Sequence, residues 1–254
     1  MWCRGFCFFL LLATFMTVAN AASPLVVRTV YQEGFPAKYN ADDAARPGIC
    51  IEVIRAMEKV DSGLRFTGLD VRASTVRIMR MLETHEIDVF VGIGRTPERE
   101  TAYTWLSPPV FVARPYLYVR REDMDSFRSM EAIRGLKQNN TILVNFGTVQ
   151  DEYLATFPDL NVDRGGTDTG RNLQKLMLGR GRFYFGSDLN TVPVISSMGL
   201  GAKISALPIR FPSADNYVVM SRDADPVIRE RLQAALRRIA ASGELERIFQ
   251  RYLK

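Results

Sequence analysis

The stretch DVFVGIGRTPER, residues 88–99, carries the strongest prediction of the chain's fold and function. It begins with a short apolar run, which predicts a buried strand over residues 88–93. Glycines follow, and Thr96 and Pro97 then suit the N-cap and the first position of a helix, which places Arg99 in its first turn. Backbone N–H groups at a helix start attract an anion, and a guanidinium can hold a carboxylate with two parallel bonds. The stretch therefore predicts a carboxylate-binding site.

Strands and helices alternate before this stretch. Residues 24–31 are apolar and rich in β-branched residues, which predicts a buried strand, and residues 64–71 are the second predicted strand. Residues 49–60 have apolar side chains at helical spacing, and Ser74 or Thr75 can cap a further helix. The order strand, helix, strand, helix, strand predicts a parallel sheet that is covered by helices on both faces.

A second series of elements follows the polar segment 123–134, which marks the boundary of a second lobe. Its predicted elements are a strand at 141–145, a helix through Tyr153 and Leu154, a helix at 173–178 capped near Asp168 or Thr169, and a strand at 183–185. A last strand at 217–220 precedes a helix that starts at Asp225-Pro226 and a final helix after Gly243. We expect the chain to cross between the lobes near residues 113–120 and 208–216, so that the C-terminal helices return to the first lobe.

The first 22 residues have the pattern of a cleavable export signal. Arg4 supplies a positive charge, residues 6–16 are apolar, and Ala19-Asn20-Ala21 is a small-residue cleavage motif, so we expect cleavage after Ala21. The apolar run is shorter than the roughly 20 residues that a membrane-spanning helix needs. We therefore expect a periplasmic protein that is free in solution.

Composition disfavours several classes of function. The chain carries a net charge of +5, but its basic residues are scattered and mixed with acids, which argues against nucleic-acid binding. Cys3 and Cys7 leave with the signal, so Cys50 has no intramolecular disulfide partner. His85 is the only histidine, and nothing near it in sequence suits a catalytic triad. We expect no metal, no cofactor and no catalytic residue.

The order of several short motifs carries a resemblance to a known family. The motifs are residues 88–99, Trp105-Leu-Ser107-Pro108-Pro109, Gly147-Thr148, Gly186-Ser-Asp188, and the tail from Asp225 to Leu253. In this order the sequence resembles the family 3 bacterial solute-binding proteins, whose members include the lysine/arginine/ornithine, histidine, glutamine and cystine binders. The resemblance covers essentially all of the chain after the signal.

This resemblance implies an α/β architecture, the type II periplasmic binding protein fold. Each of its two lobes would be a mainly parallel sheet flanked by helices, with two crossover strands between them. Lobe 1 would comprise residues 23–115 and 213–254, and lobe 2 residues 116–212. The implied function is capture of a small carboxylate-bearing ligand, an amino acid above all, for an inner-membrane ABC permease, by a monomer without enzymatic activity.

The resemblance also implies roles for single residues. Arg99 matches the arginine that holds the ligand carboxylate, Thr148 matches a second contact to that carboxylate, and Asp188 matches the acid that holds the ligand amino group. A zwitterion needs a cation at one end and an anion at the other, and two lobes supply both when the cleft closes.

The first loop and the glycines before Arg95 complete the predicted site. Tyr31 and Phe35 lie where the family places an aromatic ring against the ligand, although both could be core residues. The family commonly has a serine or threonine where this chain has Gly94-Arg95, so a hydroxyl contact is missing here. The backbone groups of Gly92 and Gly94 could replace it, because glycine lets a ligand approach the main chain.

Two alternative functions remain open at this point. Cyclohexadienyl dehydratases share the fold and use an acidic general acid in the cleft, but the sequence offers no paired carboxylates at a cleft position. A binding protein of this kind could also present its ligand to a membrane receptor instead of a permease.

Overall fold

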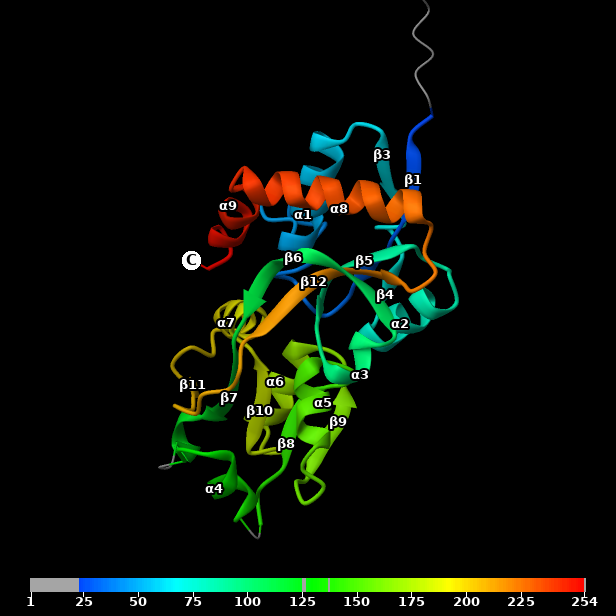
Figure 1. The fold of residues 1–254 in the computed structure, drawn as a ribbon. Helices are drawn as coiled ribbons and strands as arrows, with labels where there is room; N and C mark the ends of the chain where they lie inside the picture. The colour runs from blue at the N-terminus through cyan, green and yellow to red at the C-terminus, as the bar shows by residue number, and fades with distance from the viewer. Residues whose placement is uncertain (1–22, 125–126, 137, 254) are drawn as a thin grey trace, which may run out of the picture.

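The computed structural model describes residues 23–124, 127–136 and 138–253. The predicted export signal, residues 1–22 with its cleavage site, lies outside the described residues. Two lobes stand one above the other in Figure 1, and long strands pass between them. Within the described ranges, no helix has both the length and the apolar composition needed to span a membrane.

The first lobe is formed by both ends of the described chain. Its N-terminal elements are β1 (Leu25–Arg28), β2 (Tyr31–Gln32), α1 (Ile49–Val60), β3 (Leu64–Thr67), β4 (Arg72–Ala73), α2 (Thr75–Glu83), β5 (Val89–Gly94), α3 (Pro97–Glu100) and β6 (Tyr103–Ala113). Its C-terminal elements are β12 (Ala214–Ser221), α8 (Pro226–Ala241) and α9 (Glu244–Gln250). Figure 1 shows α8 and α9 beside α1, so the two ends of the chain share one core.

The second lobe is a five-stranded sheet with helices on both faces. Its elements are β7 (Pro115–Arg120), the 3-10 turn η1 (Arg121–Asp123), α4 (Met130–Arg134), β8 (Ile142–Asn145), α5 (Val149–Ala155), β9 (Val162–Gly166), α6 (Thr169–Met177), β10 (Phe183–Ser187), α7 (Asp188–Ser197) and β11 (Ile204–Ala206). The strand order is β11-β7-β10-β8-β9.

Alternating side chains along β10 fill two separate cores of this lobe. Phe183 and Phe185 pack on one face of the sheet, with Ile133 of α4 and Leu154 of α5 in the same cluster. Tyr184 points to the other face, where the helices α6 and α7 cover it. Because side chains alternate along a strand, a run that is buried on both faces is apolar throughout.

The strands at the lobe boundary pair in antiparallel fashion. The strands β1 and β3 are parallel, as are β8 with β9 and β10. The parallel sheet predicted for the first lobe is not continuous, however, because β5 belongs to a separate three-stranded sheet in which β12 pairs antiparallel with both β5 and β6. The reason is direction: β5 and β6 run toward the second lobe, whereas β12 returns from it.

The chain passes between the lobes at two places. The strand β6 ends at Ala113 in the first lobe, and β7 begins at Pro115 in the second. The return lies between the end of β11 at Ala206 and the start of β12 at Ala214. Both passages border the space between the lobes, so this space is the natural place for a ligand.

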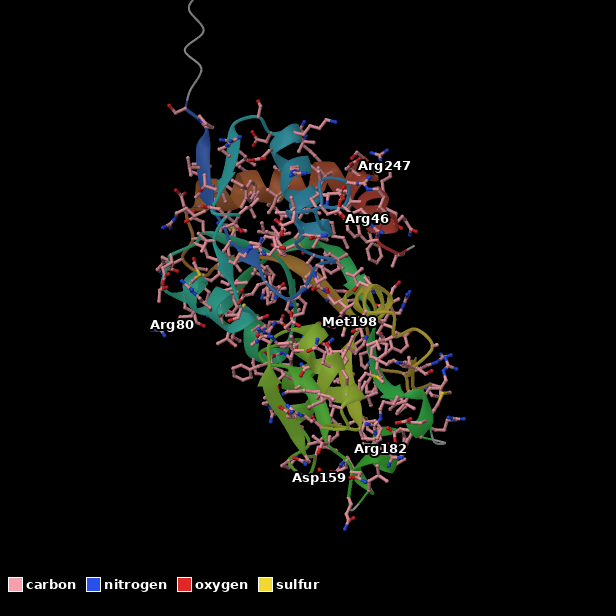
Figure 2. All side chains as sticks on the ribbon, turned by 180° about the vertical axis from the view of Figure 1, so that it is seen from behind. Arg46, Arg80, Asp159, Arg182, Met198 and Arg247 are labelled. Carbon is pink, nitrogen blue, oxygen red and sulfur yellow. The ribbon has the colours of Figure 1, made fainter. Side chains whose placement is uncertain are left out.

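Charged side chains are distributed over both lobes. Figure 2 shows Arg46 and Arg247 near α9 on the first lobe and Asp159 at the far end of the second. Asp159 pairs there with Arg134 at 2.8 Å, and both side chains are exposed. Exposed pairs of this kind contribute little to stability, which leaves the apolar cores as its main source.

Candidate functional site

A small cavity lies between the two lobes and is lined by both. Its volume is about 50 Å³, room for a few water-sized groups. The first lobe and the returning strands contribute Gln32, Phe35, Lys38, Thr75, Ile93, Gly94, Arg99, Ala113, Ala214 and Asn216. The second lobe contributes Asn145, Thr148, Val149, Gln150, Thr169, Tyr184, Phe185, Gly186, Ser187 and Asn190.

The charges at this cavity are all positive. Lys38 and Arg99 line it, and its described lining includes no aspartate or glutamate. Both cations are largely removed from solvent, with 8% of Lys38 and 7% of Arg99 exposed. A buried cation requires a partner or loses its proton, so the surroundings of each one decide what the cavity can bind.

The turn from β5 into α3 places Arg99 at the cavity. Thr96 is the N-cap of α3, and its Oγ1 accepts a hydrogen bond of 3.3 Å from the Arg99 backbone N–H. Pro97 occupies the first helical position, where its missing N–H costs nothing. The cap and the proline therefore fix the backbone from which the guanidinium reaches across the cleft.

The guanidinium of Arg99 joins the two lobes. Its Nη1 donates to the Gly94 carbonyl at 3.2 Å within the first lobe. Its Nη2 donates to the Gly147 carbonyl at 2.8 Å in the second lobe, and Nε and Nη2 both donate to Glu152 Oε1, at 2.9 and 2.5 Å. These bonds occupy four of the five N–H groups of the side chain. Arg99 thus acts as a clasp in this closed arrangement and keeps one N–H for a ligand.

Lys38 is held by the start of α1. The backbone N–H groups of Ile49 and Cys50 donate to the carbonyls of Ala37 and Lys38, both at 3.0 Å. Gly48 makes this approach possible, because it has a φ of 103° and a Cβ at this position would clash with the Lys38 carbonyl. The loop is therefore anchored by the helix, and the lysine side chain extends from it to the cavity.

The Lys38 ammonium has no counter-ion within the described chain. Its Nζ donates one hydrogen bond, to the Gly92 carbonyl at 2.8 Å, and lies 5.2 Å from the centre of the Phe35 ring. Burial lowers the pKa of this ammonium from 10.5 to about 8, and the charge of Arg99 acts in the same direction. The Phe35 ring and the Gly92 carbonyl offset only part of the cost of burying the ammonium. An anion that enters the cavity would therefore interact strongly with it.

Neutral polar side chains complete the lining. Gln32 Nε2 donates to Thr75 Oγ1 at 2.8 Å, and Asn190 Nδ2 donates to Ser187 Oγ at 3.0 Å. The amide oxygens of Gln32 and Asn190 are buried and accept no hydrogen bond from the described residues. A buried acceptor without a donor is costly, so a ligand that donates to these oxygens would be favoured.

Gly94 lets the lobes approach each other closely. A Cβ added at this position would clash with Cγ2 of Val149, at the start of α5 in the second lobe. A serine or threonine here would hold the lobes apart. The missing side chain at Gly94 is therefore part of how the cavity closes.

Sequence comparison now identifies the family. The sequence model of one protein family, the bacterial extracellular solute-binding proteins, family 3, matches residues 27–254 of this chain. The chain belongs to this family. No curated protein sequence matches the chain.

Solved structures share the fold of this family 3 protein at low sequence identity. A histidine kinase sensor domain with similarity to periplasmic binding proteins is 18% identical, with a TM-score of 0.76 over 91% of this chain and 96% of that one. The GluR0 ligand-binding core from Nostoc punctiforme, in complex with L-glutamate, is 16% identical, with a TM-score of 0.72 and coverage of 90% and 99%. The amino acid ABC transporter substrate-binding protein AbpA from Streptococcus pneumoniae, bound to L-arginine, is 16% identical, with a TM-score of 0.72 and coverage of 89% and 94%. These likenesses show the two-lobed type II fold.

Four of the residues predicted for a family 3 site line the cavity: Phe35, Gly94, Arg99 and Thr148. Thr148 is also the N-cap of α5, where its Oγ1 accepts a bond of 3.4 Å from the Asp151 N–H. The capping and binding roles are compatible, because the N-cap residue of α5 lies at the cleft.

Three other predicted residues are not among those that line the cavity. The Gly92 carbonyl instead accepts the hydrogen bond from Lys38, and the Tyr31 hydroxyl donates to the Tyr39 carbonyl. Asp188 is the first residue of α7, and its Oδ1 accepts bonds from the backbone N–H groups of Arg114 and Leu189, at 3.0 and 2.7 Å. The carboxylate of Asp188 therefore holds the junction between β7 and α7 in this arrangement.

Lys38 and Glu152 are functional candidates that the sequence did not reveal. The surrounding sequence, Phe35-Pro-Ala-Lys38-Tyr39, gives no pattern from which a buried lysine could be recognised. Glu152 is in the first turn of α5, where an acidic residue is ordinary. Only the folded structure, with the lobes in contact, shows that Lys38 lines the cavity and that Glu152 pairs with Arg99.

Proposed function

We propose that this family 3 protein captures a small carboxylate in the cleft between its lobes and delivers it to an inner-membrane ABC permease. The observation that carries the proposal is the interlobe cavity, which has two buried cations and no acidic lining residue among the described ones. A carboxylate is the common small ligand that such a site would stabilise through charge-assisted hydrogen bonds. The protein would release the ligand chemically unchanged.

The ligands named for the solved relatives support a small carboxylate. They include L-glutamate, L-arginine and lysine, all of which carry one. Amino acids are therefore the first compounds to test, with Arg99 and Thr148 as proposed contacts to the carboxylate. The resemblance makes Asp188 the partner of an amino group, but Asp188 lies outside the cavity lining in this closed arrangement. Arg99 and Thr148 come from opposite lobes, so a bound carboxylate would be held between them.

A thermal-shift screen with the mature chain tests the binding function. A ligand at a hundred times its dissociation constant stabilises the folded state by about 2.7 kcal/mol, which corresponds to a rise in melting temperature of roughly 5–10 °C for a chain of this size. The panel contains amino acids, hydroxy acids, dicarboxylates and aromatic acids. If no carboxylate raises the melting temperature, the proposed function is wrong.

Recovery of the bound compound separates a binding protein from an enzyme. The ligand that raises the melting temperature is incubated with the protein, released by denaturation and identified by mass spectrometry. We expect the same compound in full yield. Turnover of prephenate or arogenate would instead favour the dehydratase alternative, and uptake by cells with and without this chain tests delivery to a permease.

A further inference from the structure

The Lys38 ammonium is the least compensated charge of the site. The Arg99 guanidinium has the Glu152 carboxylate beside it, but no described carboxylate lies within salt-bridge distance of Lys38. Arg99 and Lys38 also repel each other. With Lys38 protonated, these three groups carry a net charge of +1.

This balance of charge discriminates between two kinds of carboxylate. A zwitterionic amino acid brings no net charge and would place its own ammonium near two buried cations. A carboxylate without an ammonium group brings one negative charge and neutralises the closed site. The attraction between unlike charges and the repulsion between like charges are both strongest where water is excluded.

The available hydrogen-bond donors also favour Lys38 as the ligand's partner. An ammonium has three N–H groups, and Lys38 uses one of them on the Gly92 carbonyl. Two therefore remain, whereas Arg99 retains one after its bonds to the two lobes. We infer that the cavity takes a carboxylate that has no ammonium group, and that Lys38 is its counter-ion.

The neutral groups around the cavity fit hydroxyl groups on such a ligand. The buried amide oxygens of Gln32 and Asn190 accept no hydrogen bond from the described chain, and a hydroxyl can donate to either of them. An acid is also missing where an ammonium would need one, because Asp188 is outside the lining and its Oδ1 accepts two backbone N–H groups. The favoured class is thus a short hydroxy acid.

The test compares pairs of acids that differ only in an amino or a hydroxyl group. The pairs are L-alanine with L-lactate, L-glutamate with L-2-hydroxyglutarate, and L-phenylalanine with L-phenyllactate, each added at equal concentration to the wild-type mature chain. This inference rests on the proposed function, and the paired acids distinguish a failure of the inference from a failure of the proposed function. We expect the hydroxy acid of at least one pair to raise the melting temperature and its amino acid to have no effect.

Two other outcomes would contradict the inference. A rise with the amino acid that equals or exceeds the rise with the hydroxy acid would overturn this inference and leave the proposed function in place. No rise with any of the six compounds or with the wider panel would overturn both.

A pair of variants tests Lys38 directly. Lys38→Met removes the ammonium but keeps a side chain of similar length, and Lys203→Met makes the same change at an exposed position. We expect Lys38→Met to weaken hydroxy-acid binding about 30-fold or more, the range found when one partner of a desolvated charge pair is lost. Binding within threefold of wild type would show that Lys38 is not the counter-ion. The comparison of paired acids on the wild-type chain needs no variant and stands whether or not Lys38→Met folds.

Discussion

Replacing Lys38 by methionine should stabilise the protein in the absence of ligand. The pKa of this ammonium falls from 10.5 to about 8 on folding, a difference of about 2.5 pH units. One unit corresponds to about 1.4 kcal/mol, so the folded state opposes the charge by about 3 kcal/mol. The variant also loses the hydrogen bond to the Gly92 carbonyl, which reduces its gain in stability by about 1 kcal/mol. We therefore expect Lys38→Met to be about 2 kcal/mol more stable than wild type near pH 7.

The size of this stability difference depends on pH. Below the folded pKa, both the folded and the unfolded wild-type chain carry the proton, and the folded state bears the full cost. As pH rises from about 8 toward 10.5, the folded state loses the proton while the unfolded state keeps it, so wild type gains stability relative to the variant. The advantage of Lys38→Met should therefore disappear over this window.

Neighbouring groups do not obscure this comparison. Burial raises the pKa of the Cys50 thiol to about 12 and also raises the pKa of the Tyr39 hydroxyl. The titration of Cys50 and Tyr39 in the unfolded chain is common to wild type and variant, so it cancels in the difference.

Urea unfolding at several pH values between about 7 and 10 measures the difference in free energy of unfolding. Lys203→Met is the control, because it makes the same change at an exposed side chain. A difference between wild type and Lys38→Met that stays constant across this range would refute the assignment of Lys38 as a buried ammonium without a counter-ion.

Further predictions concern the clasp, the closure and the export signal. Arg99→Ala should weaken carboxylate binding about 30-fold or more in a titration while the circular dichroism spectrum stays unchanged, and binding within threefold would contradict the role of this arginine. Gly94→Ser should also weaken binding, because its side chain would clash with Val149 when the lobes close. Gly201→Ser, which has open space around it, is the matched control, and equal affinities for the two variants would count against the closure. N-terminal sequencing of periplasmic protein should find a chain that begins directly after Ala21, and an uncleaved N-terminus would contradict the signal.

Elements with a strong local pattern could be predicted from the sequence. Residues 49–60 have apolar side chains at helical spacing, and α1 has these bounds. The strand predicted at residues 88–93 forms as β5, Val89–Gly94, and α8 begins with Asp225 and Pro226 in the predicted cap and first positions. In each case the local signal and the tertiary packing favour the same structure.

Elements with a weak local pattern were not predicted. The helix α7 contains Pro193 and distributes its apolar residues around its circumference, so it has no amphipathic periodicity. The strand β9 has the sequence VDRGG and forms at the edge of the sheet, where pairing with β8 compensates for its poor strand propensity. Both elements depend on the rest of the lobe.

The residues of the candidate site also differ in how far the local sequence reveals them. Arg99 is predicted from a helix start that is encoded within a few residues, and Thr148 from the resemblance to the family; both line the cavity. The role of Lys38 depends on the Gly92 carbonyl, which is 54 positions away in sequence, and on closure of the second lobe. The contact between Arg99 and Glu152 likewise exists only when the lobes meet. Burial of a charge is a tertiary property, and the local sequence does not reveal it.

Proton uptake on binding tests the central claim most directly, because it reports the charge that the ligand meets. The hydroxy acid with the largest thermal shift is titrated calorimetrically into wild type near pH 9, in two buffers with different ionisation enthalpies. At this pH the free protein has a largely neutral Lys38, and a bound carboxylate would restore its charge. We predict uptake of close to one proton by wild type and of none by Lys38→Met. Absence of uptake by wild type, or equal uptake by both proteins, would contradict a carboxylate held by Lys38.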